Sequence, residues 1–154
     1  MNFQKINRSF WIFYLDADRE IELLNNFGKW TYFYDASQES ADFAEMICEK
    51  IVRDGVAISA KHSNEDYGGI HGFGVCYFYC NGSDIDARKK ILRFMLDNNM
   101  IRKTNAGELM DISFEYDIQT GDAERDHQGE TKIQLSHFVN LKTGEWLDEI
   151  ILPT

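Results

Sequence analysis

Two lysines carry the chemistry that this sequence offers most clearly, and each belongs to a segment typical of a β-strand. Lys29 precedes the aromatic run Trp30–Tyr34, and Lys61 comes near the end of an apolar run that starts at Val56. Ammonium groups bind phosphate oxygens, and two of them at adjacent strand ends would repel each other without an anion between them. If the two strands pair, the lysines lie close together and favour a small anion site.

His62 and two tryptophans supply the other groups that a phosphorylated ligand would use. His62 follows Lys61 directly and is able to donate a hydrogen bond to a phosphate, whereas Trp11 and Trp30 offer planar rings on which a base would stack. The competing interpretation is that Lys61 and His62 end a strand in solvent and that both tryptophans belong to the core. The ligand-site hypothesis therefore rests on Lys29, Trp30, Lys61, His62 and Trp11.

Arg102 is a further ligand-binding candidate, from a basic stretch later in the chain. Four cations occupy six residues of an expected helix: Arg88, Lys89, Lys90 and Arg93. Arg102 and Lys103 would extend the patch that they form. Such a patch contacts phosphate in some proteins and is a solvated helix face in others, and both interpretations stay open here.

No motif of a familiar reaction or metal centre accompanies these residues. The four histidines lack close ligand spacing such as His-x-x-x-His. No nucleophile motif, phosphate loop or dinucleotide fingerprint occurs. Cys48, Cys76 and Cys80 are expected to be reduced core thiols, since Cys76 and Cys80 would lie about 13 Å apart on one strand. We therefore predict no catalytic residue, no metal and no cofactor.

The chain is acidic, with 26 Asp and Glu against 16 Lys and Arg and a net charge of −10. This charge makes general nucleic-acid binding an unfavourable hypothesis, because such binding needs a positive surface. Two interpretations remain, an ordinary acidic protein or one that binds a basic protein partner. Since no secretory signal or long apolar run is present, we expect a cytoplasmic protein without a membrane segment.

The elements that must position these residues follow from apolar periodicity. Strands are predicted at 9–15, 29–34, 56–62, 73–80, 109–118 and 131–139, with helices from Ser37 or Ser40 to Gly55 and from 83 or 84 to 98. The glycine-rich segment 63–74 is expected to be a loop. The 154 residues fit a single domain, 1–154. The order predicts an α+β fold: a curved, mainly antiparallel sheet with two main helices packed on one face.

Two segments resemble a known family. Gly28-Lys-Trp-Thr-Tyr-Phe33, a helix, and then Gly55-Val-Ala-Ile-Ser-Ala-Lys61 resemble the phosphothreonine-lyase-domain family. The segments 75–79 and 112–121 follow the layout of that family, and Phe10–Trp11 matches an aromatic pair in it. The resemblance implies a fold similar to the cap-binding translation initiation factor, with a ligand cleft on the concave side of the sheet. Bacterial effector lyases place a Lys-x-His pair on a strand, and the matching positions here are Lys29 and Thr31.

Three functions are compatible with this pattern. The first, which we favour over an enzyme, is a non-catalytic binding module for a small phosphorylated ligand such as a nucleotide. The second is an acidic inhibitor or immunity protein that binds and blocks a basic protein partner by mimicking its polyanion. The third is a lyase acting on a phosphorylated substrate with Lys61 as the base, which requires a lowered lysine pKa.

Overall fold

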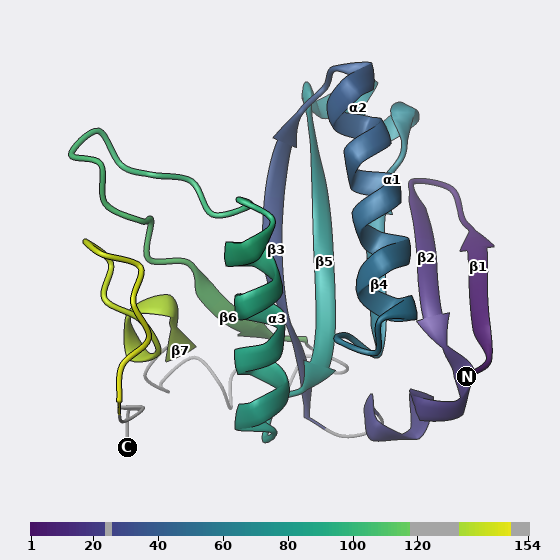
Figure 1. The fold of residues 1–154 in the computed structure, drawn as a ribbon. Helices are drawn as coiled ribbons and strands as arrows, with labels where there is room; N and C mark the ends of the chain where they lie inside the picture. The colour runs from purple at the N-terminus through teal and green to yellow at the C-terminus, as the bar shows by residue number, and fades with distance from the viewer. Residues whose placement is uncertain (24–25, 118–132, 149–154) are drawn as a thin grey trace.

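The computed structural model describes residues 1–23, 26–117 and 133–148. In this part of the chain, seven strands form one sheet in the order β1-β2-β4-β5-β3-β6-β7, and all neighbours are antiparallel (Figure 1). The strands are β1 (Phe3–Asn7), β2 (Trp11–Asp16), β3 (Phe27–Asp35), β4 (Ser59–Ser63), β5 (Phe73–Asn81), β6 (Ser113–Tyr116) and β7 (Ile133–Gln134).

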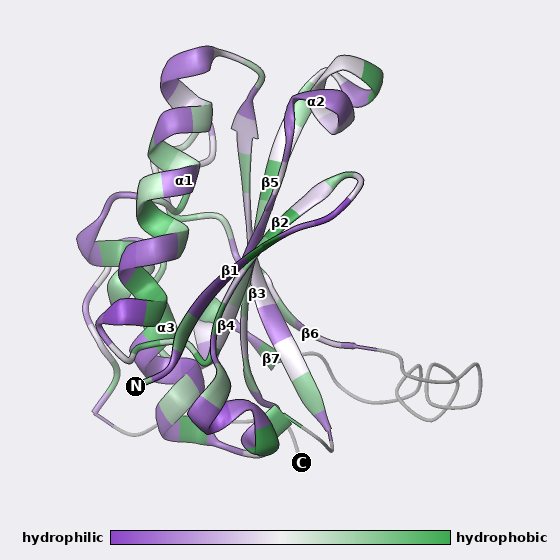
Figure 2. Cartoon of the chain, turned by 90° about the vertical axis from the view of Figure 1, so that its right-hand side faces the viewer, coloured by the Kyte–Doolittle hydropathy of each residue, from purple (hydrophilic) through white to green (hydrophobic). Residues whose placement is uncertain are grey.

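Two helices, α1 (Gln38–Arg53) and α3 (Ile85–Asp97), lie on the same side of the sheet, as Figure 2 shows. The shorter α2 (Glu65–His71) lies at one end of the sheet, between β4 and β5 in the chain. Two short 3₁₀ helices are also described, η1 (Ala17–Leu23) and η2 (Leu135–His137). The predicted α+β class is confirmed. No helix in the described ranges is long and apolar enough to span a membrane.

Helix α1 forms where its apolar stripe predicts it. Ser37 caps the helix, because its side chain accepts a hydrogen bond from the Ser40 amide at 3.2 Å. Gly55 follows the last turn with φ at +73°, a left-handed conformation that favours glycine. The buried stripe that faces the sheet consists of Ala44, Ile47, Cys48, Ile51 and Val52. This stripe and the sheet residues beneath it form one side of the hydrophobic core.

The two faces of the sheet differ, because successive residues of a strand point to opposite sides. On the side under α1 and α3, Tyr14, Trp30, Ala60 and Phe78 are fully buried. We call the other side the open face, since α1 and α3 lie away from it. Judged from strand alternation and register, the open face carries Trp11, Phe13, Lys29, Lys61, Tyr77 and Tyr79.

The glycine-rich segment 63–74 contains helix α2 between the end of β4 and the start of β5, which corrects the prediction of a loop. Asn64 caps α2 by accepting a hydrogen bond from the Tyr67 amide at 3.2 Å, and Gly72 ends the helix with φ at +78°. The prediction failed because Gly68 and Gly69 are poor helix formers. The Asn cap and the terminal glycine were the signals that pointed to a helix.

The remaining differences concern short strands. The first strand, β1, was not predicted, because its residues are mostly polar and exposed at the edge of the sheet. The predicted strand 109–118 contains only the four residues of β6, and the predicted strand 131–139 contains β7 followed by η2. Residues 118, 131 and 132 of these predictions lie outside the described ranges. Alternating apolar residues at the end of the chain therefore belong to a 3₁₀ turn as well as to a strand.

Candidate functional site

Lys29 and Lys61 meet on the open face, although their strands do not pair. Strand β5 lies between β3 and β4, with Tyr79 opposite Lys29 and Tyr77 opposite Lys61. The Nζ atoms of Lys29 and Lys61 lie 4.8 Å and 5.3 Å from the centre of the Tyr77 ring. The two strands do not pair directly, but one tyrosine of the intervening strand still brings the two cations together.

Lys61 is surrounded by aromatic rings. Its Nζ atom lies 4.3 Å from the ring centre of Trp11 and 5.2 Å from that of Phe13, in addition to its contact with Tyr77. Burial lowers the pKa of Lys61, Asp117 acts in the opposite direction, and Lys29 lowers it further. Among the described residues, Lys61 has no carboxylate within ion-pair distance. The ring contacts, worth about 0.5–2 kcal/mol each, are what hold its charge in place.

Lys29 is held differently, because it forms an ion pair with Asp117. Both side chains are largely shielded from solvent, with 17% and 21% of their surface exposed. Asp117 follows β6, whose Glu115 lies opposite Lys29 on the neighbouring strand. The open face thus holds one neutralised lysine beside one whose charge lacks a carboxylate partner.

A pocket of about 440 Å³ lies on the open face next to these lysines. We call it the open-face pocket. Lys61 and Asp117 supply its charged groups together with Glu20 of η1, and its apolar wall includes Phe13, Phe27 and Tyr79. An aromatic wall beside a lysine suits a ligand that combines a planar ring with an anionic group.

The structure separates the two tryptophans that the sequence analysis treats alike. Trp11 lies on the open face, half-buried, with its ring centre 5.2 Å from that of Tyr67 and 5.6 Å from that of Tyr77. Trp30 is fully buried on the helix side, and its ring packs against Phe114 at 5.4 Å. Trp30 is therefore a core residue and cannot stack a ligand at the open face, which corrects its predicted role.

His62 also faces away from the two lysines. It follows Lys61 in an extended strand, so it points to the helix side, where only 5% of its surface is exposed. Its Nδ1 atom donates to the carbonyl of Ser63 at 2.9 Å, and its Nε2 atom accepts from the Tyr14 hydroxyl at 3.0 Å. Burial lowers the pKa of His62. The predicted hydrogen bond from His62 to a phosphate held by Lys61 is therefore not possible in this arrangement.

Arg102 is exposed and donates to the carbonyl of Phe33 at 3.1 Å. In the described part of the chain, no contact joins it to either lysine, so its membership of the site stays a prediction. Of the basic helix patch, Lys89 and Arg93 lie over the ring of Trp146, 5.4 Å and 4.8 Å from its centre. That patch is on α3, which packs on the opposite side of the sheet from the open face.

The residues that complete the site are not among those predicted from the sequence. Tyr77, Phe13 and Asp117 contact the lysines, yet none was a candidate. Period-2 alternation was the available signal, because it puts Tyr77 and Tyr79 on the same face of one strand. Asp117 had no such signal, since its position depends on the pairing of β6 with β3. No three His, Cys, Asp or Glu residues of the described chain are grouped so as to hold a metal ion.

Comparisons with known proteins give no family for this chain. No protein-family model matches it, and neither the curated proteins nor the solved structures contain a match. The resemblance to the phosphothreonine-lyase-domain family therefore stays a prediction, and the functional argument below depends on the geometry of the open face.

Proposed function

We propose that this protein is a binding module for a small phosphorylated ligand with a planar ring, such as a nucleotide, and that the ligand binds on the open face. The observation that carries this proposal is the meeting of Lys29 and Lys61 on the ring of Tyr77. Lys61 provides the charge without a carboxylate partner for one phosphate, and Lys29, which pairs with Asp117, lies beside it across β5. Charge-assisted hydrogen bonds from an ammonium to a phosphate are short and strong.

The aromatic residues support the ring of the ligand. Trp11 and Tyr77 are half-buried, and their ring centres lie 5.6 Å apart. Phe13 and Tyr79 line the adjoining pocket. Stacking of a base on an aromatic side chain contributes about 1–3 kcal/mol and tolerates different bases. The site therefore favours a ligand with one base and one phosphate over a simple inorganic anion.

The unpaired charge of Lys61 gives a reason for an anion to bind. A half-buried ammonium without a carboxylate partner is destabilised by the loss of water, and a bound phosphate would restore a partner. The overall charge of −10 disfavours a long polyanion such as nucleic acid. A small ligand responds mainly to the charges within a Debye length, about 8 Å at physiological salt, and on this face those charges include Lys61 and the Lys29–Asp117 ion pair.

A lyase with Lys61 as its base is a second candidate, and the lowered pKa of Lys61 supports it. A base of this kind also needs a proton donor for the leaving group. The residues nearest to Lys61 that carry a hydroxyl include Tyr77, whose pKa is raised by burial. A phenol that holds its proton more firmly than usual is a poor acid, so the geometry favours binding over catalysis.

Calorimetric titration at 150 mM salt tests the binding proposal. The panel contains AMP, GMP, CMP, UMP and inorganic phosphate. We expect at least one nucleotide to bind with a Kd in the micromolar range and to stabilise the protein by about 2.7 kcal/mol at a concentration 100-fold above Kd. A panel without saturable binding at millimolar ligand would contradict the proposal.

Lys61→Met locates the binding on the open face. We expect the Kd of the bound nucleotide to rise at least tenfold, because the variant removes the charge but keeps a stem that packs on Trp11. Lys90→Met is the matched control, since Lys90 is exposed on α3. An equal effect of both variants would mean that the ligand responds to the net charge of the protein and not to this site. Loss of turnover in Lys61→Met with unchanged affinity would favour the lyase.

A further inference from the structure

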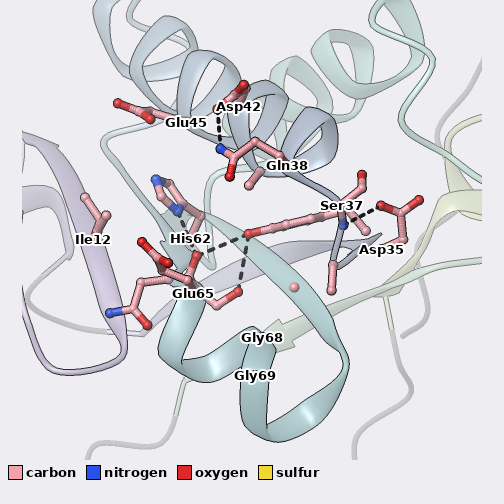
Figure 3. A pocket seen from close by; sticks show the side chains of 16 residues that line it. Ile12, Asp35, Ser37, Gln38, Asp42, Glu45, His62, Glu65, Gly68 and Gly69 are labelled. Atoms are coloured by element: carbon pink, nitrogen blue, oxygen red, sulfur yellow. Dashed lines mark hydrogen bonds between the residues drawn. The ribbon is translucent and has the colours of Figure 1, made fainter.

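A second cavity of about 440 Å³ lies on the other side of the sheet, between α1 and α2. We call it the α1–α2 cavity. Figure 3 shows Gln38, Asp42 and Glu45 on the α1 wall and Gly68 and Gly69 on the α2 wall. The binding proposed for the open face does not use this cavity.

The floor of the cavity is built from side chains that are fixed in place. Tyr34 donates from its hydroxyl to the carbonyl of Ser63 at 3.2 Å, and its ring lies against the backbone of Gly74. A Cβ atom at Gly74 would lie 2.2 Å from that ring, so only glycine permits this arrangement. His62 lines the same floor and is held by Tyr14 and Ser63. A cavity with a rigid floor keeps its shape without a ligand.

The α2 wall is kept free of side chains by two glycines. Gly68 and Gly69 lie inside a helix, where glycine is the poorest residue after proline. Neither has a positive φ, and a Cβ atom at either position would meet no heavy atom within 4 Å. Neither backbone conformation nor packing within the described chain therefore requires glycine there. The two glycines leave the backbone of this wall open to the close approach of another molecule.

The charge of the lining indicates which molecule fits. Four carboxylates line the cavity, and no lysine or arginine does: Asp35, Asp42, Glu45 and Glu65. Asp35 and Glu65 stand at the beginnings of α1 and α2, where the helix dipole alone accounts for an acid. Asp42 and Glu45 lie further along α1, beyond the reach of that effect. Lys5 pairs with Glu45 at 3.2 Å, but both side chains are exposed, so a competing cation is able to replace it.

The other titratable groups of the lining do not offset this negative charge. Hydrogen bonds from Ser37 and Ser40 hold the pKa of Asp35 below its usual value, so its carboxylate stays ionised. Burial lowers the pKa of His62, so its imidazole stays neutral. The carboxylates do not gather into a group that would hold a metal ion in the described chain. They are spaced along the two walls, which suits a larger cation with its charge at the end of a carbon chain.

We infer that the α1–α2 cavity binds an organic cation, an ammonium or guanidinium group carried on a short carbon chain. The charged group lies against Asp42 and Glu45, and the carbon chain packs on Ile12 and the Tyr34 ring. Such a group occurs in free amines and in the arginine side chains of proteins. Both sources present the same chemistry to the cavity.

Titration with agmatine, which carries a guanidinium at one end and an ammonium at the other, tests this inference at 150 mM salt. We expect saturable binding, and at least a tenfold rise in Kd in the double variant Asp42→Asn with Glu45→Gln. The matched control is Glu39→Gln with Glu49→Gln, which removes the same charge from exposed positions of α1 outside the cavity. The absence of saturable binding, or an equal loss in both double variants, would overturn the inference.

The variant Gly69→Leu tests whether the cation needs the open volume of the α1–α2 cavity beside α2. The new side chain replaces a poor helix former and meets no atom of the chain at its Cβ position, so we expect a thermal midpoint no lower than that of the unchanged protein. We expect agmatine binding to fall at least tenfold, because the side chain narrows the cavity. Unchanged affinity in a folded Gly69→Leu variant would place the cation elsewhere and overturn the inference.

A peptide distinguishes the two sources of the cation. Acetyl-Gly-Arg-Gly-amide presents an arginine side chain on a short backbone. If it binds at least tenfold more tightly than agmatine, the cavity recognises the arginine of a protein partner. If agmatine binds as tightly or more tightly, the cavity recognises a free amine. Both results support the cation site, and neither depends on nucleotide binding at the open face.

Discussion

The two sides of the sheet give neighbouring residues opposite surroundings, and Lys61 and His62 show this most directly. Lys61 points to the open face, where three aromatic rings surround an ammonium that lacks a carboxylate partner in the described chain. His62 points to the helix side, where a tyrosine and a backbone carbonyl satisfy both ring nitrogens. Lys61 is therefore able to pair with an anion, whereas both ring nitrogens of His62 already have hydrogen-bond partners.

The same contrast separates the two pockets. The open-face pocket combines Lys61 and aromatic rings with Glu20 and with Asp117, which pairs with Lys29, whereas the α1–α2 cavity combines carboxylates with a wall of glycine. The protein, whose net charge is −10, thus has one pocket with an ammonium that lacks a carboxylate partner in the described chain and one cavity lined by carboxylates without a lysine or arginine. Net charge alone would have predicted only the second, because it averages over both faces.

Trp30 and Trp11 offer the strongest test of this difference between the faces. We expect Trp30→Ala to lower the free energy of unfolding by about 3–5 kcal/mol, because it removes a fully buried indole from the core. We expect Trp11→Ala to cost about 1 kcal/mol, because its ring is half-buried, while weakening nucleotide binding at the open face. Urea unfolding measures both effects.

Should Trp30→Ala fail to fold, Trp30→Phe gives the same comparison on a smaller scale. The indole Nε1 atom of Trp30 is buried without a hydrogen-bond partner in the described chain, so its loss removes an unsatisfied donor. We therefore expect the phenylalanine variant to retain most of the stability. Equal costs for the two tryptophans would show that the open face is covered in solution.

The sheet and its two long helices follow from the sequence because their periodicity is strong. The stripe along α1 and the aromatic runs of β3 and β5 are each long enough to specify an element. Helix α2 was not predicted because Gly68 and Gly69 are poor helix formers. Strand β1 was not predicted because a short edge strand carries few apolar residues. Where local preference is weak, the sheet itself determines the structure.

The site was harder to predict than the fold, because it depends on strand order. Alternation along β4 already implies that Lys61 and His62 point to opposite sides, although both were predicted to bind the same phosphate. The order β4-β5-β3 was not available from local pattern, since it depends on long-range pairing. Tyr77 therefore emerged as the residue between the lysines only from the structure. The same limit applies to Asp117, which reaches Lys29 through the pairing of β6.

Alanine substitutions at Gly74 and Gly69 compare the floor of the α1–α2 cavity with its α2 wall. We expect Gly74→Ala to destabilise the protein by about 1–3 kcal/mol, because the new methyl group would overlap the Tyr34 ring and force it to move. We expect Gly69→Ala to leave stability unchanged or to raise it by up to about 1 kcal/mol, since alanine is the better helix former. Thermal and urea unfolding measure both changes. A cost at Gly69 equal to that at Gly74 would mean that α2 packs more tightly than its open wall implies.

The pH dependence of the free energy of unfolding tests whether His62 is neutral in the folded protein, with both ring nitrogens hydrogen-bonded. Burial lowers its pKa in the folded protein, so the unfolded chain takes up a proton at a higher pH than the folded one does. The contribution of His62 is therefore complete above the unfolded pKa of about 6.5 and is lost as the pH falls from there toward the folded pKa. The loss is at most about 1.4 kcal/mol for each pH unit in that window.

His62→Gln isolates this contribution from that of the carboxylates, which titrate in both proteins. We expect the variant to be less stable than the unchanged protein at pH 7.5, because glutamine does not reproduce the geometry of the bonds to Tyr14 and Ser63. We expect the difference in free energy of unfolding to shrink at pH 5.5, because there the unfolded chain binds a proton at this histidine more readily than the folded protein does. A difference that stays constant between the two pH values would mean that folding does not shift the pKa of His62. The contrast between the two sides of β4 would then concern packing and not charge.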